Sequence, residues 1–188
     1  MLNLGPNPVL LLIDVQSGFD HGAWGERNNL HAEANIARLL TFWRQTERPV
    51  FHVRHDSTDP TSPLRPGQPG NDFKPPFIPQ GTEPVFAKTV NSAFIGTRLE
   101  TTLRAGNHQS VVIAGLTTNH CVSTTARMAG NLGFQTYVVS DATACFDRVG
   151  LDAHLRPAEE VHAAALSDLH GEFATVVETN ALIRQLTP

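Results

Sequence analysis

The feature that most constrains this chain is a regular alternation of short apolar runs with longer helical patterns. Four runs predict strands, at residues 8–14 (PVLLLID), 49–55 (PVFHVRH), 110–115 (SVVIAG) and 134–141 (FQTYVVSD), with shorter candidates at 83–88 and 173–179. Near-continuous apolar runs are typical of strands that are covered on both faces. Helical spacing of apolar residues lies between them, at 29–47, 92–105, 120–132 and from Pro157 to Gly171. The alternation predicts a parallel α/β sandwich.

The segment from Ser57 to Pro84 breaks this alternation. It holds 8 of the chain's 13 prolines and few periodic apolar residues. One interpretation is a disordered insert. We favour a folded loop that serves as a lid or binding wall, because Phe73, Phe77 and Ile78 are apolar side chains that it can bury. With 188 residues the chain can form a full core, so we expect one domain over residues 1–188.

Charge and composition argue against several classes of partner. The formal net charge is -4 and no basic run occurs, so we expect no nucleic-acid partner. No apolar stretch is long enough to span a bilayer, and Asp14 interrupts the first apolar run, which favours a strand over a signal peptide. The two cysteines are too few for a disulfide framework. We therefore expect a cytoplasmic protein with free thiols, and a small molecule as its partner.

Three reactive side chains are predicted to meet at one edge of the sheet. Asp14 closes the first run, Lys88 closes the run at 83–88, and Cys121 follows the run at 110–115 by one turn. Ligands of open parallel sheets bind beyond the carboxyl ends of the strands. Each residue alone has a structural interpretation: Asp14 as a cap, Lys88 as a solvated charge and Cys121 as a buried apolar filler. Together they favour a catalytic interpretation.

The combination fits nucleophilic catalysis at a carbonyl carbon. The nucleophile is the thiolate, and both a helix N-terminus and the Lys88 ammonium group favour that form of Cys121. Asp14 can accept the thiol proton and return it to a leaving amine. Backbone amides of the turn GLTTNHC can donate to the oxyanion. His120 is a less suitable base, because neighbouring helical residues diverge by about 100°.

Four stretches carry a family pattern, in order, over nearly the whole chain. They are IDVQSGF (13–19), AKTVNSAFIGTRLE (87–100), VVIAGLTTNHCVSTTARMAGNLGFQTYVVSDATA (111–144) and VHAAALSDLHGEFATVV (161–177). They resemble the isochorismatase-like cysteine hydrolases, a superfamily that includes nicotinamidases and N-carbamoylsarcosine amidohydrolase. The pattern is specific to the superfamily and does not select one member.

The resemblance implies both a fold and a site. The fold would be a three-layer, Rossmann-like α/β sandwich with a six-stranded, mostly parallel sheet and helices on both faces, assembled as a homodimer or homotetramer. Asp14, Lys88 and Cys121 occupy the family's catalytic positions. A cis peptide bond would join Leu116 and Thr117 and direct the backbone N–H groups of Thr117 and Cys121 toward the oxyanion.

The metal pattern of the nicotinamidases is missing from the sequence. Those enzymes use an Asp-x-His…His pattern after the second strand, whereas residues 51–60 read FHVRHDSTDP. His52 and His55 lie three residues apart on a predicted strand and point to opposite faces, which makes them a poor ligand pair. We expect one histidine to be packed and the other to line the cleft, and we expect no metal and no cofactor.

Further site residues are expected from their position beside the three reactive groups. The predicted substrate contacts are Gln16, Phe19, Asn91, Phe94, Asn119 and His120. Three aromatic residues are candidates for pocket walls, with a core or subunit-interface role equally open: Trp24, Phe73 and Phe77. Cys145 is interpreted as a packing residue, with a position at the border of the cleft as the alternative.

The leading functional hypothesis is a hydrolase that cleaves a small amide or related C–N bond through a Cys121 thioester. The alternative is an isochorismatase-type vinyl-ether hydrolase that uses Asp14 as an acid; family members with that activity commonly lack the thiol. A nucleotide-binding or redox module is disfavoured, because G-x-G-x-x-G after a strand, the P-loop and C-x-x-C motifs are absent. A catalytically silent scaffold is disfavoured by the intact Asp, Lys and Cys set.

Overall fold

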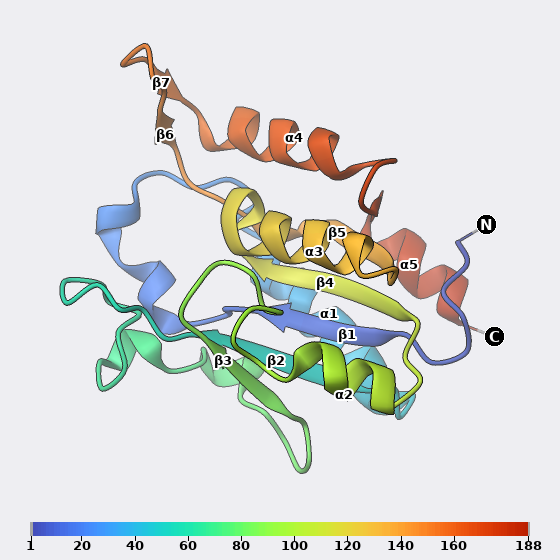
Figure 1. Ribbon diagram of the computed structural model, residues 1–188. Coiled ribbons are helices and arrows are strands. Elements are labelled where there is room, and N and C mark those ends of the chain that lie inside the picture. The colour runs from blue at the N-terminus through green and yellow to red at the C-terminus, as the bar shows by residue number, and fades with distance from the viewer. Residues whose placement is uncertain (1, 188) are drawn as a thin grey trace.

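A computed structural model describes residues 2–187 and shows a six-stranded sheet in which every neighbouring pair of strands is parallel (Figure 1). The strand order is β3-β2-β1-β4-β5-β8. The strands are β1 (Val9–Ile13), β2 (Val50–His55), β3 (Val85–Lys88), β4 (Ser110–Leu116), β5 (Gln135–Ala144) and β8 (Thr175–Val177). Each lies on one of the predicted runs, so the expected sheet is confirmed.

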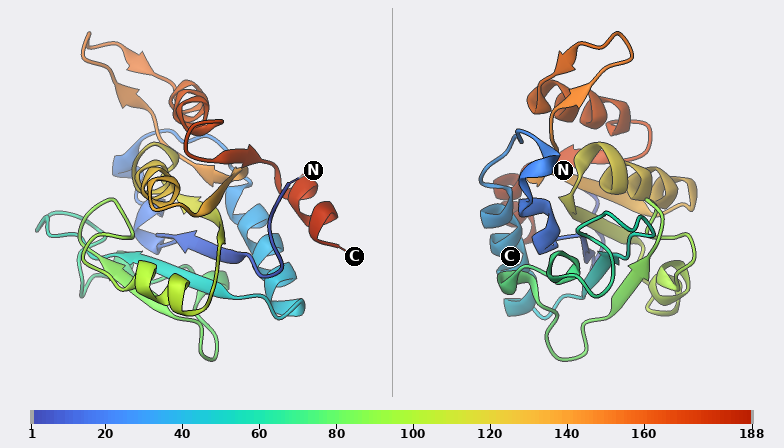
Figure 2. Two further views of the ribbon diagram at one scale, coloured as in Figure 1. Left: turned by 45° about the vertical axis from the view of Figure 1, so that its right-hand side comes forward. Right: turned by 90° about the vertical axis from the view of Figure 1, so that its left-hand side faces the viewer.

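Helices cover both faces of the sheet (Figures 1 and 2). One face packs against α2 (Leu99–Ala105), α3 (Ser123–Asn131) and α4 (Ala158–Leu169), and the other packs against α1 (Ala32–Gln45) and α5 (Thr179–Leu186). Successive side chains of β1 point to opposite faces of the sheet, so Leu11 packs in the core under α2, α3 and α4, and Leu12 packs in the core under α1 and α5. Within residues 2–187, none of the helices has the length and apolarity needed to cross a membrane.

Several elements differ from the sequence-based prediction. The helix expected at 92–105 begins only at Leu99, because residues 92–98 form turns and Gly96 has a positive φ of 73°. Helix α5 was not predicted. Nor was the hairpin of β6 (Arg148–Val149) and β7 (Leu155–Arg156), which projects away from the sheet (Figure 2). These elements are too short to show a clear period in the sequence.

The Pro-rich segment is folded against the rest of the molecule. It contains the 3₁₀ turns η3 (Pro69–Asn71) and η4 (Pro75–Phe77), and Phe77 is buried against α1. The expectation that Ile78 is buried was wrong, since 54% of it is exposed. The ammonium group of Lys74 instead anchors the segment, at 2.5 Å from Asp20 and 2.7 Å from Glu33. Asp20 belongs to the turn η1 (Ser17–Asp20), which is followed by η2 (Gly22–Trp24).

Gly115 permits the close approach of β4 to β1 that brings the two strand ends together. Its φ is 128°, and a Cβ atom there would overlap the carbonyl oxygen of Ile13. We expect Gly115→Ala to lower the free energy of unfolding by about 2–4 kcal/mol, through backbone strain and overpacking. Urea denaturation measures this loss. Gly22→Ala is the control, because its added methyl group meets nothing within 4 Å; an equal loss in both variants would contradict the prediction.

Candidate active site

The three reactive residues meet at the carboxyl edge of the sheet, as their positions in the sequence predicted. Asp14 directly follows β1 with a φ of 50°, and Lys88 is the last residue of β3. Cys121 lies in a short π-helical segment, η5 (Thr118–Val122), which continues into α3. Parallel strands bring these ends to one edge, so residues more than 100 positions apart in the sequence become neighbours.

The ammonium group of Lys88 is the centre of the cluster. It donates to Asp14 Oδ2 at 2.6 Å, to His55 Nδ1 at 3.1 Å and to Cys121 Sγ at 3.2 Å. Asp14 and Lys88 are almost completely buried, and 8% of Cys121 is exposed. The opposite charges of Lys88 and Asp14 offset part of the desolvation cost that either would carry alone.

The second carboxylate oxygen of Asp14 accepts no hydrogen bond from the part of the chain that the structure describes. Asp14 Oδ1 is buried and has no hydrogen-bond partner among residues 2–187. A carboxylate oxygen, the Cys121 sulfur and a ring nitrogen of His55 all lie within 4.8 Å of one another. The thiol itself contacts Asn91 Oδ1 at 3.7 Å. Because an orphaned buried acceptor is costly, Oδ1 is a ready acceptor for a proton delivered by the thiol or by a ligand.

The thiol of Cys121 is protonated in the resting protein, contrary to the expectation of a stabilised thiolate. Burial, the largest cause, and the charge of Asp14 together raise its pKa to about 12, against the opposing effect of Lys88. The helix N-terminus and the ammonium group therefore do not outweigh burial next to a carboxylate. The sequence predicted that Lys88 lies near the thiol, but it did not show how deeply the thiol is buried, and burial has the larger effect on the thiol pKa.

The same burial raises the pKa of Asp14, and the charge of Lys88 and its hydrogen bond lower it. A carboxyl group with a raised pKa is a stronger base than an exposed one. Transfer of the thiol proton to Asp14 leaves the total charge of the cluster unchanged, since the negative charge moves from one neighbour of Lys88 to the other. The site can thus form a thiolate without exchanging a proton with solvent.

The turn before Cys121 has a cis peptide bond and a side-chain hydrogen bond to α4. The Leu116–Thr117 peptide bond is cis, which confirms the expectation drawn from the resemblance. Thr118 Oγ1 lies 2.9 Å from Nδ1 of the buried His162 on α4. Thr117 and Cys121, whose backbone N–H groups are the predicted oxyanion donors, both line the cavity described next.

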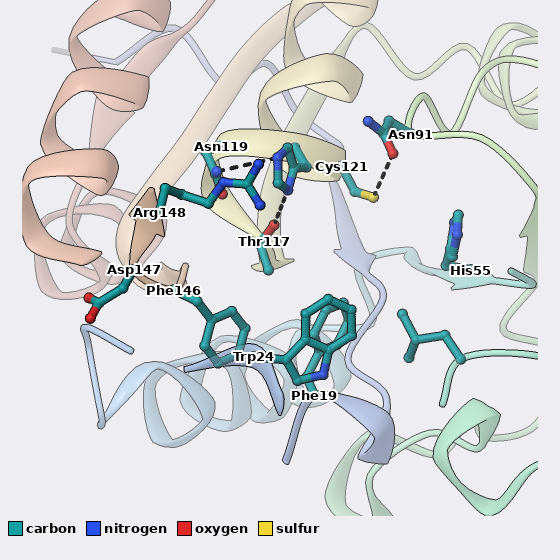
Figure 3. Close-up of a pocket in the computed structure, with 12 residues that line it drawn as sticks. Phe19, Trp24, His55, Asn91, Thr117, Asn119, Cys121, Phe146, Asp147 and Arg148 are labelled. Atoms are coloured by element: carbon teal, nitrogen blue, oxygen red, sulfur yellow. Dashed lines mark hydrogen bonds between the residues drawn. The ribbon is translucent and has the colours of Figure 1, made fainter. Parts of the chain in front are cut away.

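A cavity of about 220 Å³ opens beside Cys121 (Figure 3). Its lining residues are Phe19, Trp24, His55, Leu64, Asn91, Thr117, Asn119, His120, Cys121, Phe146, Asp147 and Arg148. Four of the predicted substrate contacts are among them: Phe19, Asn91, Asn119 and His120. Of the three candidate walls only Trp24 lines the cavity; it forms an aromatic cluster with Phe19 and Phe146, with ring centroids 5.3–6.3 Å apart.

Two predicted substrate contacts lie elsewhere. Gln16 is fully buried, where its amide bonds to the backbone of His55 and Asn71 and fastens the Pro-rich segment to β2. Phe94 stacks on Phe134 in the core, with ring centroids 6.0 Å apart. Neither residue lines the cavity. Both follow a reactive residue closely in sequence, but the chain turns between them, so proximity in sequence did not place them in the site.

The two histidines of β2 divide as expected. His52 is fully buried and bonds to Glu83 at 2.8 Å, whereas His55 lines the cavity. Burial and the adjacent Lys88 lower the pKa of His55 to about 4, so its ring is neutral and can accept from the ammonium group. Asp14, His55 and Cys121 are spaced closely enough to hold a metal ion. The Lys88 ammonium group hydrogen-bonds to all three of them, so a metal ion there would have to displace it.

Sequence reasoning missed four lining residues. Leu64 comes from the Pro-rich segment, and Phe146, Asp147 and Arg148 follow β5. The strand predicted to end at residue 141 continues to Ala144, which carries the next residues to the same edge of the sheet as Cys121. A search beyond the strand ends would have found the last three of these residues if the end of β5 had been predicted correctly.

The protein has a parallel α/β fold, with a buried Asp–Lys–Cys cluster and a cavity at the carboxyl edge of its sheet. This combination is typical of an α/β enzyme. Comparison with known proteins identifies the family. The Isochorismatase domain matches residues 8–181, and the chain belongs to this family of hydrolases.

Three relatives illustrate the similarity. The chain is 47% identical over 175 residues to the isochorismatase family protein YrdC of Bacillus subtilis, which covers 93% of this chain and 94% of that protein. It is 31% identical to Nicotinamidase 3 of Arabidopsis thaliana, over 95% of this chain and 88% of that protein. The crystal structure of an isochorismatase-family protein from Chromobacterium violaceum superposes with a TM-score of 0.95 at 44% identity, covering 99% and 96% of the two chains.

Proposed function

We propose that this hydrolase cleaves a small amide, or a related C–N bond, through a thioester on Cys121. The observation that carries the proposal is the buried cluster in which Lys88 contacts both Asp14 and Cys121 while Asp14 Oδ1 has no partner. One relative is named a nicotinamidase, an amide-hydrolysing class, which supports the same chemistry. The presence of the thiol favours this reaction over vinyl-ether hydrolysis.

In the first half-reaction, the thiol proton moves to Asp14 and the sulfur attacks the amide carbon. The C–S bond forms as the carbonyl π electrons move to oxygen, where the amides of Thr117 and Cys121 can stabilise the negative charge. The oxyanion then collapses and the C–N bond breaks. Asp14 returns its proton to the leaving nitrogen, which departs as ammonia or an amine.

In the second half-reaction, water attacks the thioester and gives a proton to Asp14. Collapse of the second oxyanion breaks the C–S bond and releases a carboxylic acid. The sulfur takes back the proton from Asp14, which restores the resting thiol. The raised pKa of Asp14 suits a group that must accept and release a proton twice in one cycle.

The test is a screen of small primary amides for ammonia release, together with acid quench and mass analysis of the Cys121 peptide. We expect an acyl adduct on Cys121 and ammonia release in the wild-type protein, and neither in Cys121→Ala. Cys145→Ala is the matched control, because that thiol is also buried but does not line the cavity. Turnover that persists in Cys121→Ala would contradict the thioester and favour ether hydrolysis with Asp14 as the acid.

A further inference from the structure

Arg148 places an unpaired positive charge at the cavity. It lines the cavity at the base of the β6–β7 hairpin, and its guanidinium group has no hydrogen bond or ion pair with any residue in the range 2–187. The hairpin register sets it opposite Arg156, whose guanidinium group is already bound to Asp152 at 2.6 Å. Like charges directly across a hairpin are destabilising, so folding alone does not explain Arg148.

The carboxylate of the preceding residue, Asp147, is bonded elsewhere. Asp147 Oδ1 accepts from the backbone N–H of Ala158, at 2.7 Å, and so caps the first turn of α4. In Figure 3 the Asp147 carboxylate points away from the cavity, while the Arg148 guanidinium group extends toward Asn119 and Thr117. The side chain of Arg148 is therefore directed at the cavity and not at its neighbour.

Apart from the Asp147 carboxylate, which lines the cavity but is bonded to the first turn of α4, the other ionisable groups of the site carry no net charge. Asp14 and Lys88 neutralise each other, and the thiol of Cys121 is uncharged. Burial lowers the pKa of His120, and the charge of Arg148, which lines the same cavity, lowers it further. The cavity thus combines a reactive end at Cys121 with a cationic end at Arg148, beside an aromatic wall.

We infer that Arg148 binds a carboxylate on the substrate, so that the enzyme acts on small amides carrying an anionic group. This inference rests on the proposed function. A guanidinium group binds a carboxylate through two parallel N–H···O bonds, which fixes the orientation as well as the affinity. An amide held in this way would present its carbonyl carbon to Cys121, while the aromatic wall of Phe19, Trp24 and Phe146 packs against its apolar part.

The first experiment needs no substrate. Two alkylating reagents of matched shape, N-bromoacetylglycine and its neutral N-methylamide, are compared by their rates of reaction at Cys121; in both, sulfur displaces bromide. We expect the charged reagent to be favoured in the wild-type protein and the ratio of rates to fall roughly tenfold in Arg148→Gln, since a charge-assisted hydrogen bond is lost. Arg156→Gln is the control, because it removes the same charge from the same hairpin but does not line the cavity.

The second experiment follows ammonia release from succinamate and from its neutral isostere 4-oxopentanamide. We expect succinamate to be preferred, and Arg148→Gln to lose that preference mainly through a higher KM. An alkylation ratio that is the same in the wild-type protein and Arg148→Gln would overturn the carboxylate site, whatever amides are hydrolysed. An alkylation ratio that depends on Arg148 without any ammonia release would uphold the site for anions and contradict amide hydrolysis instead.

Discussion

Asp14→Asn is expected to abolish turnover and, at the same time, to make Cys121 more reactive toward iodoacetamide at neutral pH. Turnover should fall roughly 10³-fold, because the variant lacks the group that takes the thiol proton and delivers it to the leaving nitrogen. Alkylation needs only a thiolate. It should therefore respond in the opposite direction.

The expected increase in the alkylation rate follows from the charges that set the pKa of the Cys121 thiol. The charge of Asp14 is one of the effects that raise the pKa of Cys121, whereas Lys88 lowers it. An asparagine removes the negative charge and leaves the ammonium group 3.2 Å from the sulfur. The pKa of Cys121 should then fall, and the thiolate becomes the partner of Lys88 in place of the carboxylate.

The measurement is the rate of alkylation of Cys121 against pH, read by mass spectrometry, with the buried Cys145 as an internal reference. In the wild-type protein the rate should change little across neutral pH, because the proton moves within the cluster. Asp168→Asn, which removes an exposed charge on α4, should match the wild type. Slower alkylation in Asp14→Asn than in the wild type would contradict the prediction, since it would show that Asp14 promotes thiolate formation as a base more than its charge raises the thiol pKa.

The sequence predicted the positions of the three central residues because parallel topology forces strand ends to one edge of the sheet. Apolar runs identified β1 and β3 and hence Asp14 and Lys88 at their ends. The sequence could not predict the protonation state of Cys121. That state depends on the balance between burial and two opposite charges within a few ångströms, which is a property of the packed site and not of spacing.

The outer parts of the site were harder to predict, for different reasons in each case. Arg148 lies on a strand of two residues, which is too short to show a period. Gln16 is two residues from Asp14, yet its side chain turns away from the cavity, because its amide makes two hydrogen bonds with the backbone of His55 on β2 and one with the backbone of Asn71. A polar side chain next to a catalytic group thus serves the fold and not the substrate when nearby backbone N–H and C=O groups need it as a hydrogen-bond partner.

Lys88→Met is expected to lower the free energy of unfolding by about 3–5 kcal/mol at neutral pH, the usual effect of removing one partner of a buried ion pair. Asp14 then has no nearby cation. Its pKa, which burial already raises, must rise further once the opposing effect of Lys88 is gone. The carboxyl group of the folded variant will remain protonated well above the ordinary Asp pKa of about 4.

The loss of stability in Lys88→Met should therefore depend on pH with a definite sign. Between the unfolded pKa of Asp14 and its raised folded pKa, the folded state holds one proton more than the unfolded state, so stability falls as pH rises, by about 1.4 kcal/mol per pH unit. Urea denaturation from pH 5 to pH 8 measures this slope. The double variant Asp14→Asn/Lys88→Met is the control, because it has the same Lys88→Met substitution but no carboxyl group at position 14 to titrate. Parallel curves for the single and double variants would contradict the prediction. A diverging pair would show that Lys88 is what keeps Asp14 ionised in the resting enzyme, the condition under which Asp14 can accept the thiol proton.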